Sequence, residues 1–443
     1  MDIVPPRAKR EHAILREQPQ TARNILRFFR KKTCLVMLRA KTITADAIIP
    51  LCMEIKAATP ECRIVFLVPN DSWPGNADEN GMRTWNILKK NTVLHEAMLS
   101  VGEIRLFHCH HNPYEGELKG QILRIMDALW VCFVIFLSGN IRLLHFVEPG
   151  NRLMKLANGI AAFFGKRYAV ESRLFVGESM MRIEQKHKGE ITQDSSMYAD
   201  AVLSFSRTHA AMERGNVETY LLGCSHQFPA WVSFVRERGR LFYKSFYGTH
   251  PHLKDKKVVV FCLSIVDIQP GYGDSEMRLG RHGMRQLFLE AMDVLYSHAK
   301  DLVVFLKPHY ITNMEVLRDH LASMSGDSFH ITYEHPEVLL SGADLQISCN
   351  FSTTLWMGRI MGVPTVEYAD YSDRYLQFLR GNAYEPDAVS FFINNNQVGL
   401  DAVVQSLLQE SLPRTAMREI FPEVNLTHIR NDFWGCRDDS PSR

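Results

Sequence analysis

The stretch from Leu302 to Asp370 restricts the fold most, because it alternates short apolar runs with a helical pattern. The apolar runs have the length and composition of buried strands and are Leu302–Leu306, Ala343–Ser348 and Thr365–Tyr368. Pro308 ends the first run, since proline cannot donate to a strand ladder. Gly362 and Pro364 are the stop signal of the helical pattern that lies between the second and third runs. Strands that alternate with helices predict a parallel sheet in an α/β fold.

Side chains suited to a nucleotide stand where these three strands end. Ligands of open α/β sheets bind at the carboxyl ends of the strands. We therefore predict that the nucleotide-binding residues are Lys307, His309, Ser352, Thr353, Thr354 and Glu367. The lysine, the histidine and the hydroxyl-rich helix start suit phosphate oxygens, and the glutamate can accept two ribose hydroxyls. Taken singly, each of them could instead be a surface charge or a helix cap.

Length and composition set wide limits on the remaining chain. With 443 residues it can form two or three domains. A net charge of +2 and the lack of a base-reading motif argue against a nucleic-acid partner. The nine cysteines include no CxxC pair, which favours a reducing compartment. The most apolar stretch, Ala128–Leu137, is shorter than the roughly 20 residues that span a bilayer, so we interpret it as a core element.

The N-terminal residues 1–32 are rich in arginine and lysine and lack a continuous apolar segment. They predict a basic N-terminal extension rather than a signal peptide. Within the extension, residues 25–32 could contact an anionic membrane surface. The alternative is a helix that packs on the first domain and keeps its basic face in solvent. We expect a cytoplasmic protein that is at most peripheral, at the inner face of the membrane.

Residues 33–235 repeat the alternation of strand and helix and predict an N-terminal Rossmann-like domain. Its predicted strands are Thr33–Leu38, Arg63–Val68, Ile104–Phe107, Ile141–Val147, Arg167–Glu171, Tyr198–Ser206 and Thr219–Gly223. Its clearest helical patterns are Asp46–Ala57, Leu118–Leu129 and Arg152–Phe164. Three histidines and a cysteine occupy positions 108–111, but consecutive positions of an extended segment point to alternate faces. They cannot all bind one ion, and we predict no metal site.

Glu148 is the candidate catalytic base, because it follows the strand Ile141–Val147 and precedes a Pro-Gly turn. A carboxylate at a strand end can act as a general base when its surroundings raise its pKa toward the working pH. Glu171, at the end of the next extended segment, is the second candidate. Either residue could instead be a solvated turn residue or pair with a nearby arginine.

Residues 236–256 are charged, aromatic and rich in helix breakers, and they predict an interdomain linker. A second Rossmann-like domain is predicted at 257–410, beginning with the strand Lys257–Ser264 and carrying the nucleotide-binding residues. Behind this strand, the loop Gln269–Asp274 could cover a phosphate. Residues 411–443 are expected to form a tail that packs back on the first domain.

Two Rossmann-like halves with nucleotide-binding elements in the second half resemble the GT-B architecture of glycosyltransferases, in which the domains face each other across a cleft. Leu306–His309 resembles the Lys/Arg-Pro-His-Pro element of bacterial surface-polysaccharide transferases. That group includes sialyl- and Kdo-transferases, CDP-glycerol glycerophosphotransferases and UDP-GlcNAc 2-epimerases. Ser352–Thr354 resembles its paired-hydroxyl element, and Gly362–Pro364 with Glu367 resembles its closing strand. Glu148–Gly150 resembles, imperfectly, the acidic-acidic-Gly element that supplies the base in sialyltransferases.

The chain departs from that group at three points. Tyr310 replaces the second proline, Trp356 and Met357 replace the usual Glu-Ala, and a single acid precedes Gly150 with a proline between them.

The resemblance implies a glycosyltransferase that moves a sugar from a nucleotide-sugar donor to a cell-surface glycan or glycolipid, in capsule, O-antigen or lipooligosaccharide synthesis. It implies the donor in the second domain, the acceptor in the first and a carboxylate as base. No DxD motif stands at a strand end, so we expect a metal-independent reaction without a further cofactor. The alternatives are a sugar-nucleotide epimerase or polyol-phosphate transferase on the same fold, or a non-catalytic relative that binds a glycan or a partner.

Overall fold

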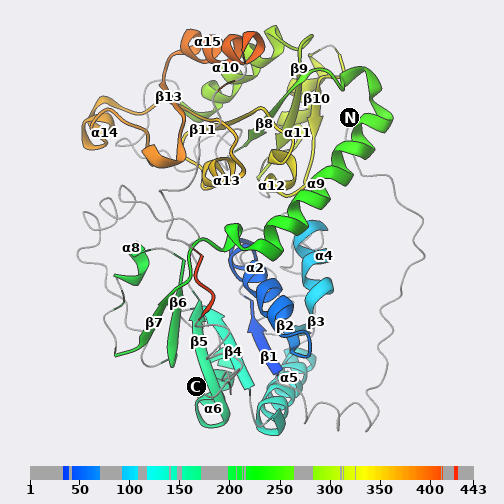
Figure 1. Cartoon of the computed structure of the whole chain (residues 1–443), viewed down its shortest axis with the longest axis vertical. Coiled ribbons are helices and arrows are strands. Elements are labelled where there is room, and N and C mark those ends of the chain that lie inside the picture. Colours follow the sequence, from blue (N-terminus) through cyan, green and yellow to red (C-terminus); the bar gives the residue numbers. More distant parts are fainter. Residues whose placement is uncertain are drawn as a thin grey trace, which may run out of the picture. The chain divides into compact units, whose positions relative to one another are not determined.

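The structure is a computed structural model, and it describes residues 33–38, 42–69, 92–107, 117–138, 141–146, 152–170, 198–205, 207–211, 213, 216–263, 283–309, 312, 314–324, 326–410, 412 and 424–427. The chain divides into two compact units (Figure 1). We call the described residues from 33 to 232, together with 424–427, the N-terminal unit. Those from 233 to 412 form the C-terminal unit.

The N-terminal unit is built on a seven-stranded parallel sheet with the order β3-β2-β1-β4-β5-β6-β7. Its strands are β1 (Thr33–Met37), β2 (Arg63–Pro69), β3 (Glu103–Phe107), β4 (Ile141–Phe146), β5 (Gly165–Val170), β6 (Ala201–Ser204) and β7 (Glu218–Leu221). Its helices are α2 (Thr42–Ala58), α4 (Thr92–Val101), α5 (Glu117–Ser138), α6 (Arg152–Phe164), α8 (Arg207–Ala210) and the 3-10 turn η1 (Ser225–Gln227). This order is doubly wound, and the winding reverses between β1 and β4.

The C-terminal unit has a six-stranded parallel sheet with the order β10-β9-β8-β11-β12-β13. Its strands are β8 (Lys257–Cys262), β9 (Leu302–Lys307), β10 (Phe329–Ile331), β11 (Leu345–Cys349), β12 (Thr365–Ala369) and β13 (Phe391–Asn394). Its remaining elements are η2 (Pro251–Leu253), α10 (Gly283–Ser297), α11 (Met314–Ala322), α12 (Pro336–Leu340), α13 (Thr354–Met361), α14 (Asp373–Phe378), η3 (Pro386–Ala388) and α15 (Gln397–Gln409). The winding is again double, and it reverses between β8 and β11.

Two doubly wound parallel sheets confirm the predicted α/β class with two Rossmann-like domains. Every strand predicted from an apolar run is present. The two edge strands β10 and β13, of three and four residues, were not predicted. The three residues of β10 are fewer than an apolar pattern needs to identify a strand. The cleft expected between the domains stays a prediction.

Helix α9 (Pro229–Thr249) and turn η2 cover most of the region predicted as a linker, residues 236–256. The boundary between the units, after Val232, falls inside this helix. Its aromatic side chains support the helix instead of interrupting it. The ring of Phe246 stacks on that of Phe242, with 6.4 Å between centroids, and lies 4.9 Å from that of Phe305 in β9.

Gly239 has a packing role in α9 and does not break the helix. A Cβ at this position would lie 1.8 Å from Oγ of Ser341, at the end of α12. The glycine therefore permits the close approach of α9 and α12. Composition alone could not separate a glycine that ends a helix from one that lets two helices touch.

Helix α5 continues without a break through the apolar run Ala128–Leu137. Its inner side packs on the sheet and on α6 through Val131, Val134 and Ile135. On its outer side, Leu129 is 63% exposed and Phe133 is 51% exposed. The interpretation of the whole run as core is therefore wrong for this outer side, because a helix turns successive side chains around its axis and only one stripe can face the sheet.

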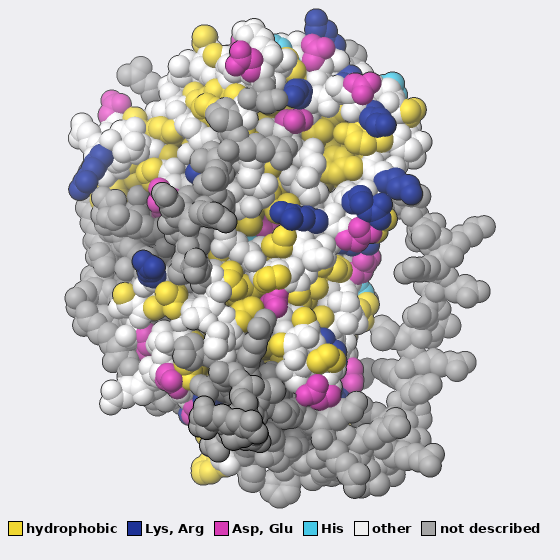
Figure 2. Space-filling view, in the orientation of Figure 1, with side chains coloured by type: hydrophobic (Ala, Val, Ile, Leu, Met, Phe, Trp, Pro, Cys, Tyr) yellow, Lys and Arg dark blue, Asp and Glu magenta, His cyan; other side chains and the backbone are white. Residues whose placement is uncertain are grey.

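Among the described residues, no helix has both the length and the apolar character needed to cross a lipid bilayer. Acidic and basic side chains are interspersed over the face shown in Figure 2, as expected for a net charge of +2. The N-terminal extension 1–32 with its proposed membrane contact, the histidine-rich positions 108–111 and the loop Gln269–Asp274 lie outside the described residues. In the expected tail, the amide of Asn425 donates to the carbonyl of Leu222 at 3.0 Å.

Candidate functional site

The register of the C-terminal sheet places two predicted site residues in one row. Lys307 ends β9 and is paired with Cys262 of β8. Cys262 is paired with Ser348 of β11, and Ser348 with Glu367 of β12. With about 4.8 Å between neighbouring strands, the Cα atoms of Lys307 and Glu367 are roughly 14 Å apart. Four adjacent strands therefore present a continuous row of positions near their carboxyl ends.

The middle of this row is the point where the winding of the sheet reverses. Strands β8 and β11 lie side by side there, and their crossover helices leave toward opposite faces. In open α/β sheets the crevice outside the carboxyl ends at this point is the usual ligand site. Lys307 stands one strand away on one side, and Ser352 follows β11 on the other. The topology thus supports a ligand site at the place that the sequence predicts.

Lys307 and His309 have different charge states. The Lys307 side chain is partly buried, and its Nζ lies 3.4 Å from the carbonyl oxygen of Pro308. Burial, and after it the nearby charge of Lys307, lower the pKa of His309 to about 4. His309 is therefore neutral at pH 7 and provides one N–H donor and one acceptor. Lys307 is the cation of this pair.

The chain turns sharply after β11 at Asn350, which has a φ of 55°. Its amide donates to the carbonyl of Tyr368 at 2.7 Å, so the turn starts from the end of β12. Asparagine adopts this left-handed conformation more readily than other residues with a side chain. The turn redirects the chain into the hydroxyl-rich segment that opens α13.

The three hydroxyl residues at the start of α13 have unequal roles. Ser352 Oγ accepts from the amide of Thr354 at 3.3 Å and lies 2.9 Å from its Oγ1. The N-cap residue Thr353 makes no side-chain capping hydrogen bond. The next amides, those of Leu355 and Trp356, donate to carbonyls three residues earlier. An anion here would therefore interact with hydroxyl groups and the helix dipole more than with unpaired amides.

Glu367 is fully buried and supports the turn before α13 from within the unit. Its Oε1 accepts from the hydroxyl of Tyr371, and its Oε2 accepts from the amide of Tyr384 at 3.3 Å. The Tyr371 hydroxyl in turn accepts from the amide of Phe351 at 3.2 Å. Sequence analysis missed Tyr371, although a tyrosine four residues after a strand-end carboxylate was the available signal. The contact of Glu367 with a ribose stays a prediction, and it requires that a ribose can reach this fully buried carboxylate.

Helix α13 packs on the sheet so closely that position 358 accepts no side chain. A Cβ on Gly358 would lie 2.0 Å from Oε1 of Gln346 and 2.6 Å from Cγ2 of Thr365. We expect Gly358→Ala to lower the free energy of unfolding, because overpacking of about 1–3 kcal/mol exceeds the gain in helix propensity of about 0.5–1 kcal/mol. Thermal unfolding measures this effect. Gly159→Ala in α6 is the matched control, since nothing lies within 4 Å of its added Cβ, and it should leave stability equal or higher.

We expect the protein to lose stability in acid because of His330 in β10. Its ring contacts those of Phe246 at 4.8 Å and Phe305 at 5.8 Å between centroids. Burial, and after it the neighbouring His250, lower the pKa of His330 to about 4. An unfolded histidine has a pKa near 6.5, so only the unfolded chain takes up this proton between about pH 6.5 and 4, and stability falls as the pH is lowered through that window. His330→Phe should flatten the fall of the melting temperature, and an unchanged slope would contradict this assignment.

Both candidate bases, Glu148 and Glu171, lie outside the described residues. In the sequence they follow β4 and β5, which are neighbours in the sheet and are paired at Phe146 and Val170. Strand β4 also borders the point where the winding of this sheet reverses. The two predictions for these carboxylates therefore concern adjacent strand ends at the expected edge of the sheet.

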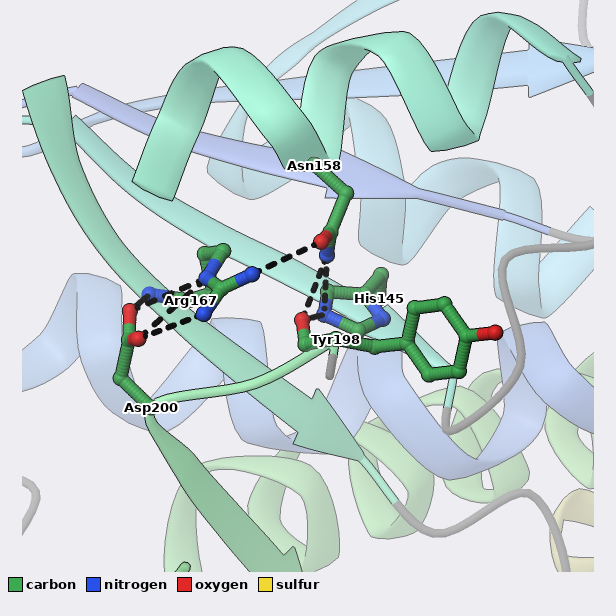
Figure 3. A network of polar contacts seen from close by, with 5 residues as sticks. All are labelled: His145, Asn158, Arg167, Tyr198 and Asp200. Atoms are coloured by element: carbon green, nitrogen blue, oxygen red, sulfur yellow. Dashed lines mark hydrogen bonds and ion pairs between the residues drawn. The ribbon is translucent and has the colours of Figure 1, made fainter. Parts of the chain in front are cut away.

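A polar network with buried His145 and Asn158 and exposed Asp200 connects the same two strands, and sequence analysis missed it (Figure 3). Arg167 of β5 pairs with Asp200, with 2.8 Å between Nη2 and Oδ1, and donates to Oδ1 of Asn158 in α6 at 3.0 Å. The amide nitrogen of Asn158 then donates to the carbonyl of Tyr198 at 2.6 Å. Nε2 of His145 lies 2.8 Å from the same carbonyl and 2.9 Å from the amide nitrogen of Asn158.

This network fixes the carboxyl half of β4 against its neighbours. Partial burial raises the pKa of Asp200, but the hydrogen bonds and charge of Arg167 outweigh it and hold that pKa below its ordinary value. Asp200 is therefore charged at neutral pH and pairs with the guanidinium. Because His145 is the residue before the last in β4, the contacts hold the end of the strand that leads to Glu148.

Solved structures that are similar to this chain over most of its length share only 10–13% of its residues. UDP-GlcNAc 2-epimerase from Neisseria meningitidis, bound to UDP-GlcNAc, is 10% identical over 91% of this chain and 98% of that chain, with a TM-score of 0.49. S. aureus MnaA in complex with UDP is 13% identical over 86% of this chain and 88% of that chain, with a TM-score of 0.47. The glycotransferase of kitacinnamycin is 12% identical over 86% of this chain and 91% of that chain, with a TM-score of 0.41. Neither protein-family models nor curated protein sequences gave a match.

The two doubly wound parallel sheets of the chain itself give it two Rossmann-like units, as a GT-B layout contains.

Proposed function

We propose that the C-terminal unit binds the nucleotide of a nucleotide-sugar donor and that the protein is a glycosyltransferase acting on a cell-surface glycan. The observation that carries the proposal is the single row of Lys307, Ser348 and Glu367 at the point where the winding of the sheet reverses. A cation on one side of that point and a hydroxyl-rich helix start on the other are suited to the two ends of a diphosphate.

Each residue has a role in this proposal. Lys307 meets the charge of the leaving phosphate, and the neutral His309 donates a hydrogen bond to it. The hydroxyl of Thr353, with Ser352 and Thr354 beside it, binds a second phosphate oxygen. Glu367 binds the ribose or, through Tyr371, holds the turn that does so. The N-terminal unit holds the acceptor, and Glu148 removes the proton of its hydroxyl, with Glu171 as the alternative base.

Binding and turnover test the proposal in two steps. A thermal-shift screen with nucleoside mono- and diphosphates should raise the melting temperature for one base above the others, because a ligand that binds only the native state stabilises it. Incubation with UDP-sugars, CMP-sugars and CDP-polyols, with and without a glycan acceptor, then identifies the reaction. Transfer to the acceptor supports a glycosyltransferase. An epimerised sugar would indicate a sugar-nucleotide epimerase, and a transferred polyol phosphate would indicate a polyol-phosphate transferase. Binding without any turnover, donor hydrolysis included, would indicate a non-catalytic protein.

We further predict that the reaction does not depend on a metal ion. The reason is that Lys307, His309 and the start of α13 provide positive potential where the leaving phosphate would lie. Turnover should be unchanged in excess EDTA. Loss of turnover that Mg²⁺ or Mn²⁺ restores would contradict the prediction.

A further inference from the structure

A cavity of about 290 Å³ lies in the C-terminal unit, between helix α9 and the ends of α12 and α13. Its described lining residues all belong to this unit and are Arg236, Gly239, Arg240, Tyr243, Ser341 and Met361. Ligand pockets usually measure about 300–1,000 Å³, so this cavity has the size for a small molecule. We call it the α9 cavity.

The α9 cavity is separate from the candidate nucleotide site. Ser341 leads into β11 and Met361 leads into β12, so both lie next to the amino ends of these strands. Lys307 and Glu367 lie near the carboxyl ends of the strands in the same sheet. At about 3.3 Å per residue, the five residues of β11 or β12 put roughly 16 Å between the two edges.

The walls of the cavity are fixed by close packing of α9 on α12. A Cβ on Gly239 would lie 1.8 Å from Oγ of Ser341, and a Cβ on Gly342 would lie 2.4 Å from Cε2 of Tyr243. The Tyr243 hydroxyl donates to the carbonyl of Leu339 at 2.5 Å. Contacts this close leave the walls little freedom, so the cavity is formed before a ligand arrives, which lowers the cost of binding.

The described lining carries two positive charges and no negative charge. Arg236 and Arg240 are exposed and lie one turn apart on the same side of α9. Arg240 donates from Nε and Nη2 to Glu237 at 2.8 and 2.6 Å, which uses two of its five N–H donors. For Arg236, no ion-pair partner is found among the residues that the structure describes. Burial raises the pKa of Tyr243, so its hydroxyl adds no negative charge.

The other lining side chains indicate which kind of anion fits. Guanidinium groups present parallel N–H donors that match the oxygens of a phosphate. Ser341 Oγ donates to the carbonyl of Val338 at 2.7 Å, so its lone pairs are left to accept from a ligand hydroxyl. Met361 is partly buried and offers a flexible apolar surface to a carbon skeleton. A phosphate and hydroxyl groups on one small carbon skeleton are the features of a phosphorylated sugar.

We propose that the α9 cavity binds a small phosphorylated sugar, with the phosphate on Arg236 and Arg240 and a sugar hydroxyl on Ser341. This site is additional to the candidate nucleotide site and does not depend on the proposed function.

Calorimetric titration of the full-length protein with a panel of hexose 1-phosphates, hexose 6-phosphates and pentose 5-phosphates tests the proposal. At least one member should bind, and it should bind more tightly than inorganic phosphate or the unphosphorylated sugar. The double variant Arg236→Gln/Arg240→Gln should weaken that member by about 100-fold or more, because each hydrogen bond to a charged group contributes a factor of about 10–150. Its melting temperature should stay the same, since both side chains are exposed.

Lys300→Gln is the matched control for the loss of positive charge. The Lys300 side chain is 86% exposed in the same unit and lies outside the cavity lining. This variant should keep the affinity of the wild type for the sugar phosphate. Lys307→Ala should keep it as well, whatever its effect on nucleotide binding.

The methyl NMR signal of Met361 gives a second, site-specific measurement. Met361→Leu assigns the signal, which should shift when the sugar phosphate is added to the wild type and stay in place in the double arginine variant. Absence of binding by every member of the panel would overturn the proposal. Binding that is lost in Lys307→Ala and kept in the double arginine variant would overturn it too, by placing the phosphate at the candidate nucleotide site. Equally tight binding of inorganic phosphate would contradict the assignment to a sugar.

Discussion

Replacing Lys307 by alanine is expected to weaken nucleotide binding by about 10- to 150-fold, the equivalent of roughly 1.5–3 kcal/mol for a hydrogen bond to a charged group. Lys307 ends β9 next to the point where the winding of the C-terminal sheet reverses, and it is the cation of the Lys307–His309 pair. Removing it leaves the leaving phosphate with a neutral imidazole and the start of α13. Calorimetric titration with the nucleotide identified by the thermal-shift screen measures the loss.

Lys257 provides the matched control for this substitution. It begins β8 and is paired with Leu302 at the amino end of the same sheet, so Lys257→Ala should leave nucleotide affinity unchanged. Lys307→Ala should also raise the pKa of His309, because the charge of Lys307 is the second cause that lowers it. That change is visible in the imidazole NMR signals without any nucleotide. Full-strength nucleotide binding by Lys307→Ala at low and physiological salt would show that the nucleotide does not bind at this edge of the sheet.

Glu148→Gln is expected to reduce turnover by about 10²- to 10⁴-fold, the usual contribution of general-base assistance. The change keeps the shape of the side chain and removes its basicity, so nucleotide affinity should remain nearly the same. The position follows β4, whose end is held by the network of His145, Asn158 and Arg167. Steady-state rates with saturating donor and acceptor measure the effect.

Two outcomes would change the assignment of the base. If turnover stays within a few-fold of the wild type, Glu148 is a turn residue, and Glu171, after the neighbouring strand β5, is the next position to substitute. If nucleotide affinity falls together with turnover, Glu148 belongs to donor binding or to folding. The division of roles between the two units would then be wrong.

The sequence by itself determined the described strands other than β10 and β13, the class of fold and the edge of the sheet where the site is expected. Apolar runs bounded by proline or glycine are local signals, because residues close in the sequence decide where a strand begins and ends. The end of α13 is an example. Gly362 has a φ of 73°, and the amides of Gly362 and Val363 donate back to the carbonyls of Arg359 and Gly358, as the sequence pattern predicts.

Tertiary structure decided what those signals leave open. The row from Lys307 to Glu367 depends on strand order, which joins residues 60 positions apart in the sequence. The burial of Glu367 and its bond to Tyr371 depend on side chains packed from β12 and its following turn. Composition predicted a linker rich in helix breakers at residues 236–256, and it could not show that Gly239 lies inside a helix and faces Ser341. All of Ala128–Leu137 was predicted as core because hydrophobicity alone does not tell which side of a helix faces the sheet. The packing of α5 on the sheet shows which side is buried and which is exposed.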